Sequence, residues 1–532
     1  MLDDILKYLG SDFKERHEGC DIIDIYPGAG VWSQKVHDLL NPRSHILMEP
    51  DEELYRPFLQ PILDQPGSIL VPKSGIVWRD LNSILTPEYL PHQVPVKDTF
   101  KPNQRNDTLL VIANIAFHPP KKYKSFNSLA LLVFHQLINS IHTSSLFQKY
   151  GQVRMLVWSR QEDTAAFLPR NMQRRRRSAM EAELYCEWVR EVCGRDGPES
   201  LWYIRDNATE TYSSLLAAER MEEAGLVVPK GRESKTLREV QAARPTARKE
   251  MAKLGSVAPE FQRSFMDTLA ALEQKHQTKL LPQDSDEYKT MKGYAWRLRG
   301  ERKKWQTLHN LVSALDNLHA KHKDRRTSPA KLQQLEDEWH TAMHSQTSNF
   351  KQEFITYRDN LHFIRQYPPL LQWDQRPYEP LVAQADEFFP NVECALVDIQ
   401  PRDVHPLLRQ VGPDSNRAAD TLELVMSGLL AQSTTPLGHA LDIVWPGAAD
   451  YIMPRWSSIA DGKNNHGMPC REGVKRSTYG MITARMLNAR QWEQLIELWM
   501  EWPFRPELHD LIARTTDTED PYAVGVMGSA VE

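Results

Sequence analysis

Hydrophobic and polar positions divide the chain into regions of different character. In the first 160 residues, short continuous apolar runs alternate with helix-like stretches such as Trp32–Leu40 and Ser128–Ile141. The apolar runs are Ile22–Tyr26, His45–Met48, Ile69–Val71, Leu109–Ala113 and Val153–Trp158. Continuous apolar strands separated by helices are typical of a parallel sheet that is covered on both faces. We therefore predict an α/β domain over residues 1–215.

The middle of the chain has a helical rather than a strand pattern. Residues 216–388 are charged and Gln-rich, and four apolar residues follow i, i+3, i+4, i+7 spacing: Leu308, Leu311, Val312 and Leu315. That spacing predicts the buried face of an amphipathic helix. A strand-like run, Ala395–Ile399, follows this region and resembles the early strands in composition. We therefore predict a mainly helical insertion over 216–388 and a strand within 389–402 that rejoins the sheet.

Residues 403–515 predict a C-terminal helical domain, followed by an acidic tail over 516–532. Its last helix shows five apolar residues at helical spacing: Trp492, Leu495, Ile496, Trp499 and Met500. Asn488 is a candidate N-cap and Pro503 is a stop signal.

The net charge of −5, from 65 Lys and Arg against 70 Asp and Glu, conceals a basic middle region. Five arginines, Arg170 and Arg174–Arg177, lie within eight residues. Lys230–Lys253 holds eight basic residues, and Lys292–Arg326 holds ten, interleaved with Tyr294, Trp296 and Trp305. Such segments suit phosphate backbones, and the aromatic rings suit stacking on exposed bases. A solvated helical surface is the alternative interpretation.

Composition excludes several classes of protein. No run approaches 18 consecutive apolar residues, so we expect no transmembrane helix. Five dispersed cysteines without a Cys-x-x-Cys pair predict neither a disulfide scaffold nor a metal site. Met1–Gly19 contains five acidic residues, whereas a transit peptide is rich in Arg and Ser and poor in acids.

Candidate cofactor-binding residues follow the first three predicted strands. The turn Asp24–Gly30 (Asp-Ile-Tyr-Pro-Gly-Ala-Gly) contains Gly28 and Gly30, which let a backbone approach a nucleoside cofactor closely. Glu49, after the second strand, is placed to accept hydrogen bonds from ribose hydroxyls. Asp80, after the third apolar run, could reach the exocyclic amine of an adenine ring.

The fourth predicted strand ends in Asn-Ile-Ala-Phe, at Asn114 and Phe117. An Asn side chain beside a backbone carbonyl and an aromatic ring can hold a flipped-out adenine, whose amine donates to the two oxygens. Lys121, Lys122 and Lys124 follow directly. We expect them to contact phosphates at the rim of a base-binding cleft.

The order of these segments resembles the family of S-adenosylmethionine-dependent rRNA adenine dimethyltransferases, and within it the fungal mitochondrial transcription factor B proteins. Three segments carry the resemblance: Asp24–Gly30, Ile112–Phe117, and Tyr150–Trp158 with the string Tyr-Gly-Gln-Val-Arg-Met-Leu-Val-Trp. It covers about residues 18–215 and 390–510. The resemblance implies a Rossmann-like class I methyltransferase sheet, interrupted by the helical insertion and followed by the C-terminal helical domain.

The resemblance also implies a site. S-adenosylmethionine would be held by Asp24, Tyr26, Gly28, Gly30, Glu49, Asp80 and Asn114. Asn114 and Phe117 would hold the base, as catalytic residues in an active enzyme. Nucleic acid would be bound by Phe117, Lys121, Lys122, Lys124, Arg174 and Arg175.

Departures from the enzyme pattern predict an impaired cofactor pocket. Tyr26 stands where the enzymes have the first glycine of the turn, and we expect its ring to crowd the space of the methionine half. Ala116 replaces a proline, and no Gln-Asn-Phe-like string precedes the first strand. We therefore expect methyl transfer to be lost.

The resemblance favours a mitochondrial transcription initiation factor that helps a single-subunit mitochondrial RNA polymerase open promoter DNA. The alternative is an active dimethyltransferase acting on adenines of mitochondrial small-subunit rRNA, and a third is a scaffold on mitochondrial ribosomes. We expect a monomer in the mitochondrial matrix, a location implied by the resemblance alone.

Overall fold

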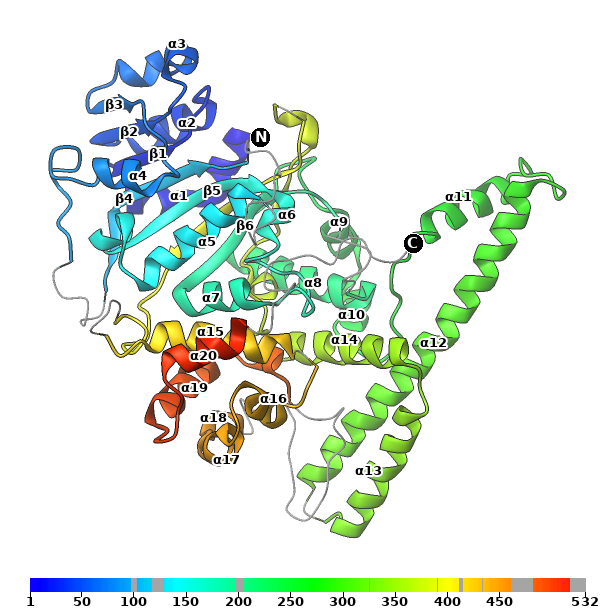
Figure 1. The fold of residues 1–532 in the computed structure, drawn as a ribbon. Helices are drawn as coiled ribbons and strands as arrows, with labels where there is room; N and C mark the ends of the chain where they lie inside the picture. Colours follow the sequence, from blue (N-terminus) through cyan, green and yellow to red (C-terminus); the bar gives the residue numbers. More distant parts are fainter. Residues whose placement is uncertain are drawn as a thin grey trace.

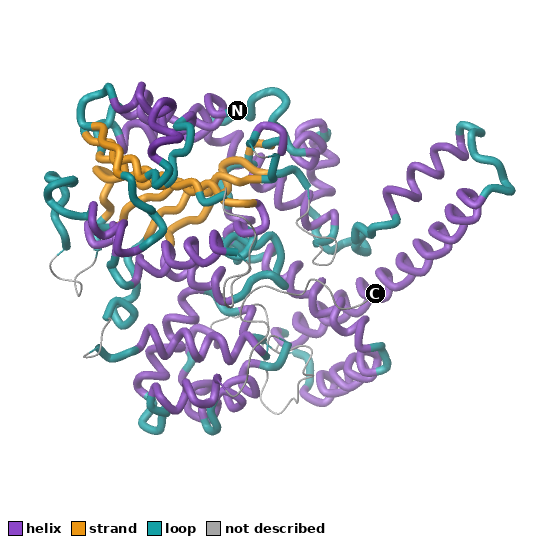
Figure 2. The backbone as a smooth tube through the Cα atoms, turned by 45° about the horizontal axis from the view of Figure 1, so that its top comes forward, coloured by secondary structure: helices purple, strands orange, loops and turns teal. Residues whose placement is uncertain are grey.

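A mixed eight-stranded sheet forms the centre of the molecule in this computed structural model (Figures 1 and 2). The model describes residues 1–96, 103–116, 128–197, 205–324, 326–389, 391–410, 415–432, 434–460 and 482–516. The strands are β1 (Asp21–Ile25), β2 (Ser44–Met48), β3 (Ser68–Val71), β4 (Arg105–Asn114), β5 (Gln152–Arg160), β6 (Cys186–Gly194), β7 (Leu381–Val382) and β8 (Cys394–Pro401). Their order is β3-β2-β1-β4-β5-β8-β6-β7. Within this sheet β8 is antiparallel to both neighbours and the other pairings are parallel, which confirms the predicted α/β class.

One face of the sheet packs on the largest hydrophobic core. Alternate strand residues such as Ile23, Val111 and Met155 point into it. The helices of the α/β domain on this side are α4 (Trp78–Ile84), α5 (Leu129–His142) and α7 (Arg177–Tyr185). Because side chains alternate across a strand, the residues between them supply the opposite face.

The opposite face is covered by a second set of helices. Ile22, Leu110 and Leu156 lie in this core, which also contains Leu215 and Leu237 from downstream helices. The helices are α1 (Leu2–His17), α2 (Val31–Leu40), α8 (Asn207–Ala224) and α9 (Lys235–Ala242). A smaller cluster seats α3 (Glu52–Leu63) beside β2. Residue 215, the predicted end of the α/β domain, lies in the middle of α8. The whole of this helix belongs to the layer that covers the sheet.

The C-terminal helices extend the first core below the sheet (Figure 1). They are α15 (Ala418–Ala431), α16 (Leu437–Val444), α17 (Ala448–Ile452), α18 (Ser457–Ala460), α19 (Ala489–Glu501) and α20 (Leu508–Thr516). The helix predicted to be the last corresponds to α19, but α20 follows it. The predicted stripe of α19 is buried except for Met500, which is half-buried. Asn488 and Gln491 form a reciprocal capping box at its start, so the predicted cap is confirmed.

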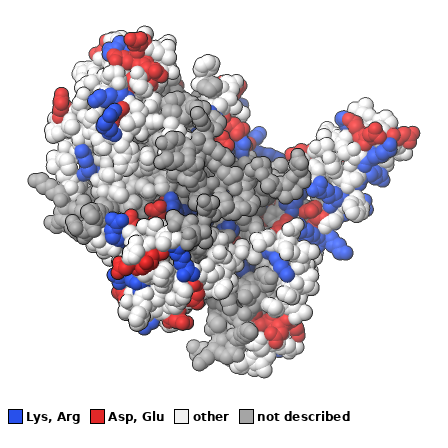
Figure 3. Space-filling model, in the orientation of Figure 1, with Lys and Arg blue, Asp and Glu red and all other residues white. Residues whose placement is uncertain are grey.

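The connection from β6 to β8 contains the predicted helical insertion. After α9 it forms α10 (Pro245–Met251), α11 (Met266–Gln277), α12 (Asp286–Lys323), α13 (Pro329–His344) and α14 (Ser348–Ile364). Helix α12 has 38 residues, or about 57 Å of length, and it projects from the body with α11 and α13 (Figures 1 and 2). Basic side chains gather along it in Figure 3. The predicted Leu308–Leu315 stripe is buried in a separate core formed with α13 and α14.

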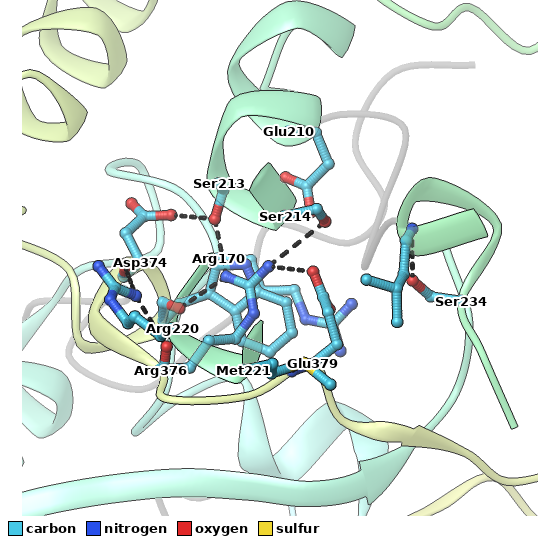
Figure 4. Close-up of polar contacts among 12 residues, drawn as sticks. Arg170, Glu210, Ser213, Ser214, Arg220, Met221, Ser234, Asp374, Arg376 and Glu379 are labelled. Atoms are coloured by element: carbon cyan, nitrogen blue, oxygen red, sulfur yellow. Dashed lines mark hydrogen bonds and ion pairs between the residues drawn. The ribbon is translucent and has the colours of Figure 1, made fainter. Parts of the chain in front are cut away.

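A buried polar network attaches the returning end of the insertion to α8 (Figure 4). The carboxylate of Asp374 accepts hydrogen bonds from Ser213 Oγ at 2.6 Å and from Arg205 Nη1 at 2.9 Å. Arg376 donates to Ser213 Oγ at 2.7 Å and to Glu379 Oε1 at 2.6 Å. This network lies just before β7, so the chain rejoins the sheet upstream of residue 388.

An ion pair buried in the sheet joins β5 to β8. Arg154 Nε and Nη2 each donate to an oxygen of Asp398 at 2.7 Å, and Trp188 Nε1 also donates to that carboxylate at 3.0 Å. The side chains of Arg154 and Asp398 are 6% and 1% exposed. Each of these two charges can be buried only because the other one pairs with it.

Asp398→Ala should destabilise the protein by about 3–5 kcal/mol, because it leaves the buried guanidinium of Arg154 without its counter-charge. The double variant Arg154→Met/Asp398→Leu should be much closer to wild type, since it buries no charge. Urea unfolding followed by circular dichroism measures both effects.

The matched control is the exposed pair Arg105–Glu187, with side chains 41% and 44% exposed. Arg105→Gln should cost less than about 1 kcal/mol. Equal losses from Asp398→Ala and Arg105→Gln would contradict the structural importance of the buried pair.

Candidate functional site

The candidate site lies where the strand order reverses, at the carboxyl ends of β1, β2 and β4. In open α/β sheets, ligands bind in the crevice at such a switch point. Gly28 and Gly30 follow β1, Glu49 follows β2, and Asn114 ends β4. Ile25 pairs with Ala113, so Asn114 lies beside the start of the glycine turn. The topology thus brings together residues from three of the predicted motifs.

The turn after β1 is built from left-handed backbone conformations. Tyr26, Gly28 and Gly30 have φ values of 57°, 57° and 69°. Gly30 N donates to Pro27 O at 2.9 Å, and a Cβ on Gly30 would lie 2.6 Å from a methyl carbon of Leu59. Glycine at position 30 therefore suits both the left-handed backbone angle and the close approach of Leu59 from α3.

Glu49 is fixed by the backbone around it. Its two oxygens accept hydrogen bonds from the N–H groups of Gly28 and Asp51, each at 3.1 Å. Burial raises the pKa of Glu49, and the two N–H donors act in the opposite direction. A carboxylate offers about four acceptor sites, so this one retains acceptor capacity for hydroxyl donors.

Tyr26 fills the β2–β3 side of this turn. Its backbone N–H donates to Met48 O at 3.0 Å, and its hydroxyl lies 2.7 Å from Ser74 Oγ, beyond β3. The ring is 7% exposed. Burial raises the pKa of Tyr26, and the negative charges of Glu49, Asp51 and Asp80 add to that effect. The ring is therefore packed within the turn, where the carboxylates of Glu49 and Asp80 influence it.

Two other predicted cofactor residues differ in accessibility. Asp24 is buried, and its Oδ2 lies 3.4 Å from His45 Nε2, whose ring contacts His37 through Nδ1 atoms 3.0 Å apart. Asp24 thus contacts the neighbouring strand β2 and has no open face toward the crevice. Asp80 lies in the first turn of α4 with its side chain 22% exposed, beside the side chain of Arg79.

Asn114 is half-buried at the end of β4. Its Oδ1 accepts a hydrogen bond from Ala116 N at 3.2 Å, and the next residue, Ile115, donates from its N–H to Trp158 O at 2.9 Å. These bonds shape the first residues of the loop that follows. The other predicted base-binding residues, Phe117, Lys121, Lys122 and Lys124, lie outside the described residues.

The arginine run is mostly internal. Arg175 is buried, and it donates to both oxygens of Glu183 at 2.9 and 2.5 Å and to Leu487 O at 2.7 Å. Arg170 pairs with Glu191, Arg177 pairs with Glu423, and Arg174 is half-buried. Arg175 is therefore a packing residue between α7 and the C-terminal helices, which corrects its prediction as a nucleic-acid contact.

Asp163, a buried carboxyl that the sequence did not indicate, lies at the start of α5. Ser128 caps α5 by accepting from Leu131 N, and its hydroxyl donates to Asp163 Oδ1 at 2.9 Å. Asp163 is 5% exposed, and burial raises its pKa to about 6. The sequence around Asp163 gives no signal of the raised pKa, because the shift comes from the burial of the side chain in the folded protein.

We also searched the described residues for metal-binding clusters and for membrane-spanning helices. Within the described ranges, no group of three or more His, Cys, Asp or Glu side chains could hold a metal ion. Cys20, Cys186, Cys193 and Cys394 are buried and free. The helices that the structure describes include none with the length and apolar character needed to span a bilayer.

The fold and the site define an α/β protein with a glycine turn at a topological switch point. No protein-family model matches the chain. Part of the chain is similar to mitochondrial transcription factor 1 of Saccharomyces paradoxus, with 24% identity over 137 residues. This stretch is 26% of the present chain and 36% of the yeast protein. The match therefore spans about a third of the relative's length, and the relative is a mitochondrial transcription factor.

Asp163→Asn should change how stability depends on pH. Because folding raises the pKa of Asp163 from 3.8 to about 6, its stabilising contribution is complete below pH 3.8 and is lost as pH rises through 6. The variant does not ionise, so its stability relative to wild type should increase between pH 4.5 and 7.5, by about 2 kcal/mol. Urea unfolding across this pH range measures the difference.

The exposed neighbour Glu162 provides the control. Glu162→Gln should keep the pH profile of the wild type. A profile for Asp163→Asn that runs parallel to that of wild type would show that Asp163 does not titrate in this range.

Proposed function

We propose that this protein is a mitochondrial transcription initiation factor that assists a single-subunit mitochondrial RNA polymerase in recognising and melting promoter DNA. The observation that carries the proposal is the partial match to mitochondrial transcription factor 1. The polymerase and promoter DNA are its proposed partners. The mitochondrial matrix is its proposed location, and a monomer its proposed state.

The sheet is proposed to be a Rossmann-like class I methyltransferase sheet. Its order reverses between β1 and β4, as in doubly wound nucleotide-binding folds. Two of the three segments that carry the family resemblance, Asp24–Gly30 and Ile112–Phe117, begin within adjacent strands β1 and β4 and run past their carboxyl ends. Strand β8, which returns after the insertion, completes the central part of the sheet between β5 and β6.

A site at a switch point of this kind suits an unstacked base. Enzymes that act on bases take them out of the helix and hold them by their edges and faces. Asn114 supplies a polar edge at the end of β4, and the sequence assigns the stacking surface to Phe117 and the phosphate contacts to the lysines after it. The same chemistry can hold the single strand of a melted promoter.

The alternative function is an S-adenosylmethionine-dependent rRNA adenine dimethyltransferase. The left-handed turn at Gly28 and Gly30 and the fixed carboxylate of Glu49 favour it, because they suit a nucleoside with free ribose hydroxyls. The Tyr26 ring disfavours it. The residue is buried and its hydroxyl contacts Ser74, so we expect the ring to crowd a cofactor bound at this turn.

Tyr26→Gly should strengthen binding of S-adenosylmethionine at least tenfold over wild type, because it removes the ring and suits the φ of 57°. Glu49→Ala should weaken whatever binding remains. Isothermal titration calorimetry measures all three affinities, with each tenfold change corresponding to about 1.4 kcal/mol.

Tyr26→Phe is the matched control, since it keeps the ring and loses only the hydroxyl that contacts Ser74. It should bind the cofactor as weakly as wild type. Equally tight binding by wild type and Tyr26→Gly would refute the steric interpretation and favour the enzyme.

Phe117→Ala tests the transcription proposal directly. Loss of a stacking surface should weaken binding to a pre-melted promoter about 5- to 150-fold, because base–aromatic stacking contributes about 1–3 kcal/mol per base. Binding to duplex should change little. With the cognate polymerase, initiation from a linear promoter should fall more than initiation from the pre-melted one.

Phe504→Ala, at a side chain 80% exposed in the C-terminal domain, is the control and should leave both templates unaffected. Tritium transfer from labelled S-adenosylmethionine to small-subunit rRNA tests the alternative in parallel. Methylation by the wild type without promoter-dependent stimulation would overturn the initiation-factor proposal.

A further inference from the structure

One face of α12 carries a row of cations around an exposed tryptophan. The row, here termed the α12 stripe, consists of Lys289, Lys292, Trp296, Arg299 and Lys303. Relative to Trp296 the cations lie at i−7, i−4, i+3 and i+7, which places all five side chains on one side of the helix. All five residues are exposed, and Trp296 is 74% exposed. The stripe is about 21 Å long.

The opposite face of this half of α12 is buried against α11. Leu269 and Leu272 of α11 form a small core with Met291 of α12. Leu298 of α12 packs against the same core. Since these contacts fix the inward side, the stripe faces away from α11, on the projecting part of the molecule (Figures 1 and 3).

Trp296 lies between two helical glycines. Gly293 and Gly300 are at i−3 and i+4 from it, and a Cβ at either position would meet nothing within 4 Å. Each glycine costs a helix interior about 0.5–1 kcal/mol relative to alanine. Because a Cβ would meet no neighbour at either position, close packing does not explain the two glycines. Together they leave one side of the indole without a neighbouring side chain. A flat ring could approach the indole from that side.

The cations of the stripe keep their charge available. Within the described part of the chain, Lys292, Arg299 and Lys303 form no ion pair, and Lys289 pairs only with Asp286, in a contact where both side chains are largely exposed. In contrast, Lys304, on the neighbouring flank of the helix, pairs with Glu353 of α14. Three of the four cations of the stripe are thus not neutralised by a paired carboxylate within the described part of the chain.

We propose that the α12 stripe binds single-stranded nucleic acid, with its cations on consecutive phosphates and Trp296 stacked on a base. A positive row with an aromatic platform is the combination that single strands require. Duplex is disfavoured, because its bases are stacked internally and cannot reach the ring. This proposal is independent of the proposed function, because it is argued from the exposure and the charge of residues on α12 and uses no residue of the candidate site.

Trp296→Ala should weaken binding of fluorescein-labelled 12-nucleotide oligo-dT or oligo-U about 5- to 150-fold, as expected for loss of one stacked base. Trp296→Phe should retain most of the affinity, and duplex binding should change less than twofold. Fluorescence anisotropy with the full chain measures these affinities, and the dT and U probes distinguish DNA from RNA.

The charge contribution has its own test. Lys303→Gln should reduce the slope of log affinity against log salt concentration by about 0.7, as expected for one lost phosphate contact with a single strand. Lys331→Gln is the matched control, because Lys331 is exposed on α13 outside the stripe. Phe504→Ala is the corresponding control for an exposed aromatic ring.

Photocrosslinking locates the contact. An oligonucleotide containing 5-bromodeoxyuridine should crosslink to the tryptic peptide 293–297, which contains Trp296. Circular dichroism should show unchanged helix content in Trp296→Ala, because the side chain is mostly exposed. Single-strand affinity of Trp296→Ala within twofold of wild type, or an equal loss of duplex affinity, would overturn the proposal.

Discussion

The buried ion pair between Arg154 and Asp398 is the constraint on which the sheet depends. It joins β5 to a strand that the chain reaches only after the whole insertion, and it does so in a setting where either charge alone would be unfavourable. Strand β8 then separates β5 from β6, so its position determines how β6 and β7 join the sheet. A one-residue slip would move Asp398 to the other face of the strand, away from Arg154, so the pair also specifies register.

A long excursion between β6 and β8 is tolerated for two physical reasons. The entropy cost of closing a loop grows only slowly with its length, and the insertion buries its own apolar surface in separate cores. Its return is held by a network in which the Trp373 ring contacts two guanidinium groups, with Arg170 at 4.0 Å and Arg376 at 4.2 Å from the ring centroid. The projecting helices can therefore vary without disturbing the crevice at the strand ends.

Much of the sheet was predictable because five of its parallel strands are continuous apolar runs. Strand β6 was not predicted, since Glu187, Arg190 and Glu191 interrupt its apolar pattern. The structure accommodates these charges by pairing Glu191 with Arg170 and placing Arg190 over the ring of Trp188. The proximity of Gly28 and Glu49 followed from topology alone. The burial of Arg175 did not, because a run of arginines has the same sequence whether it faces phosphates or internal carboxylates.

Tyr26 shows how a left-handed turn at the switch point of the sheet is packed by its own side chain. A non-glycine residue at a φ of 57° carries backbone strain of about 1–3 kcal/mol, which surrounding contacts must offset. Here the buried ring and the contact between its hydroxyl and Ser74 supply them. The turn thus keeps the backbone shape suited to a nucleoside while a protein group fills the adjoining space. These contacts join the turn after β1 to β2 and to the segment after β3, so the turn is held in shape by the protein itself.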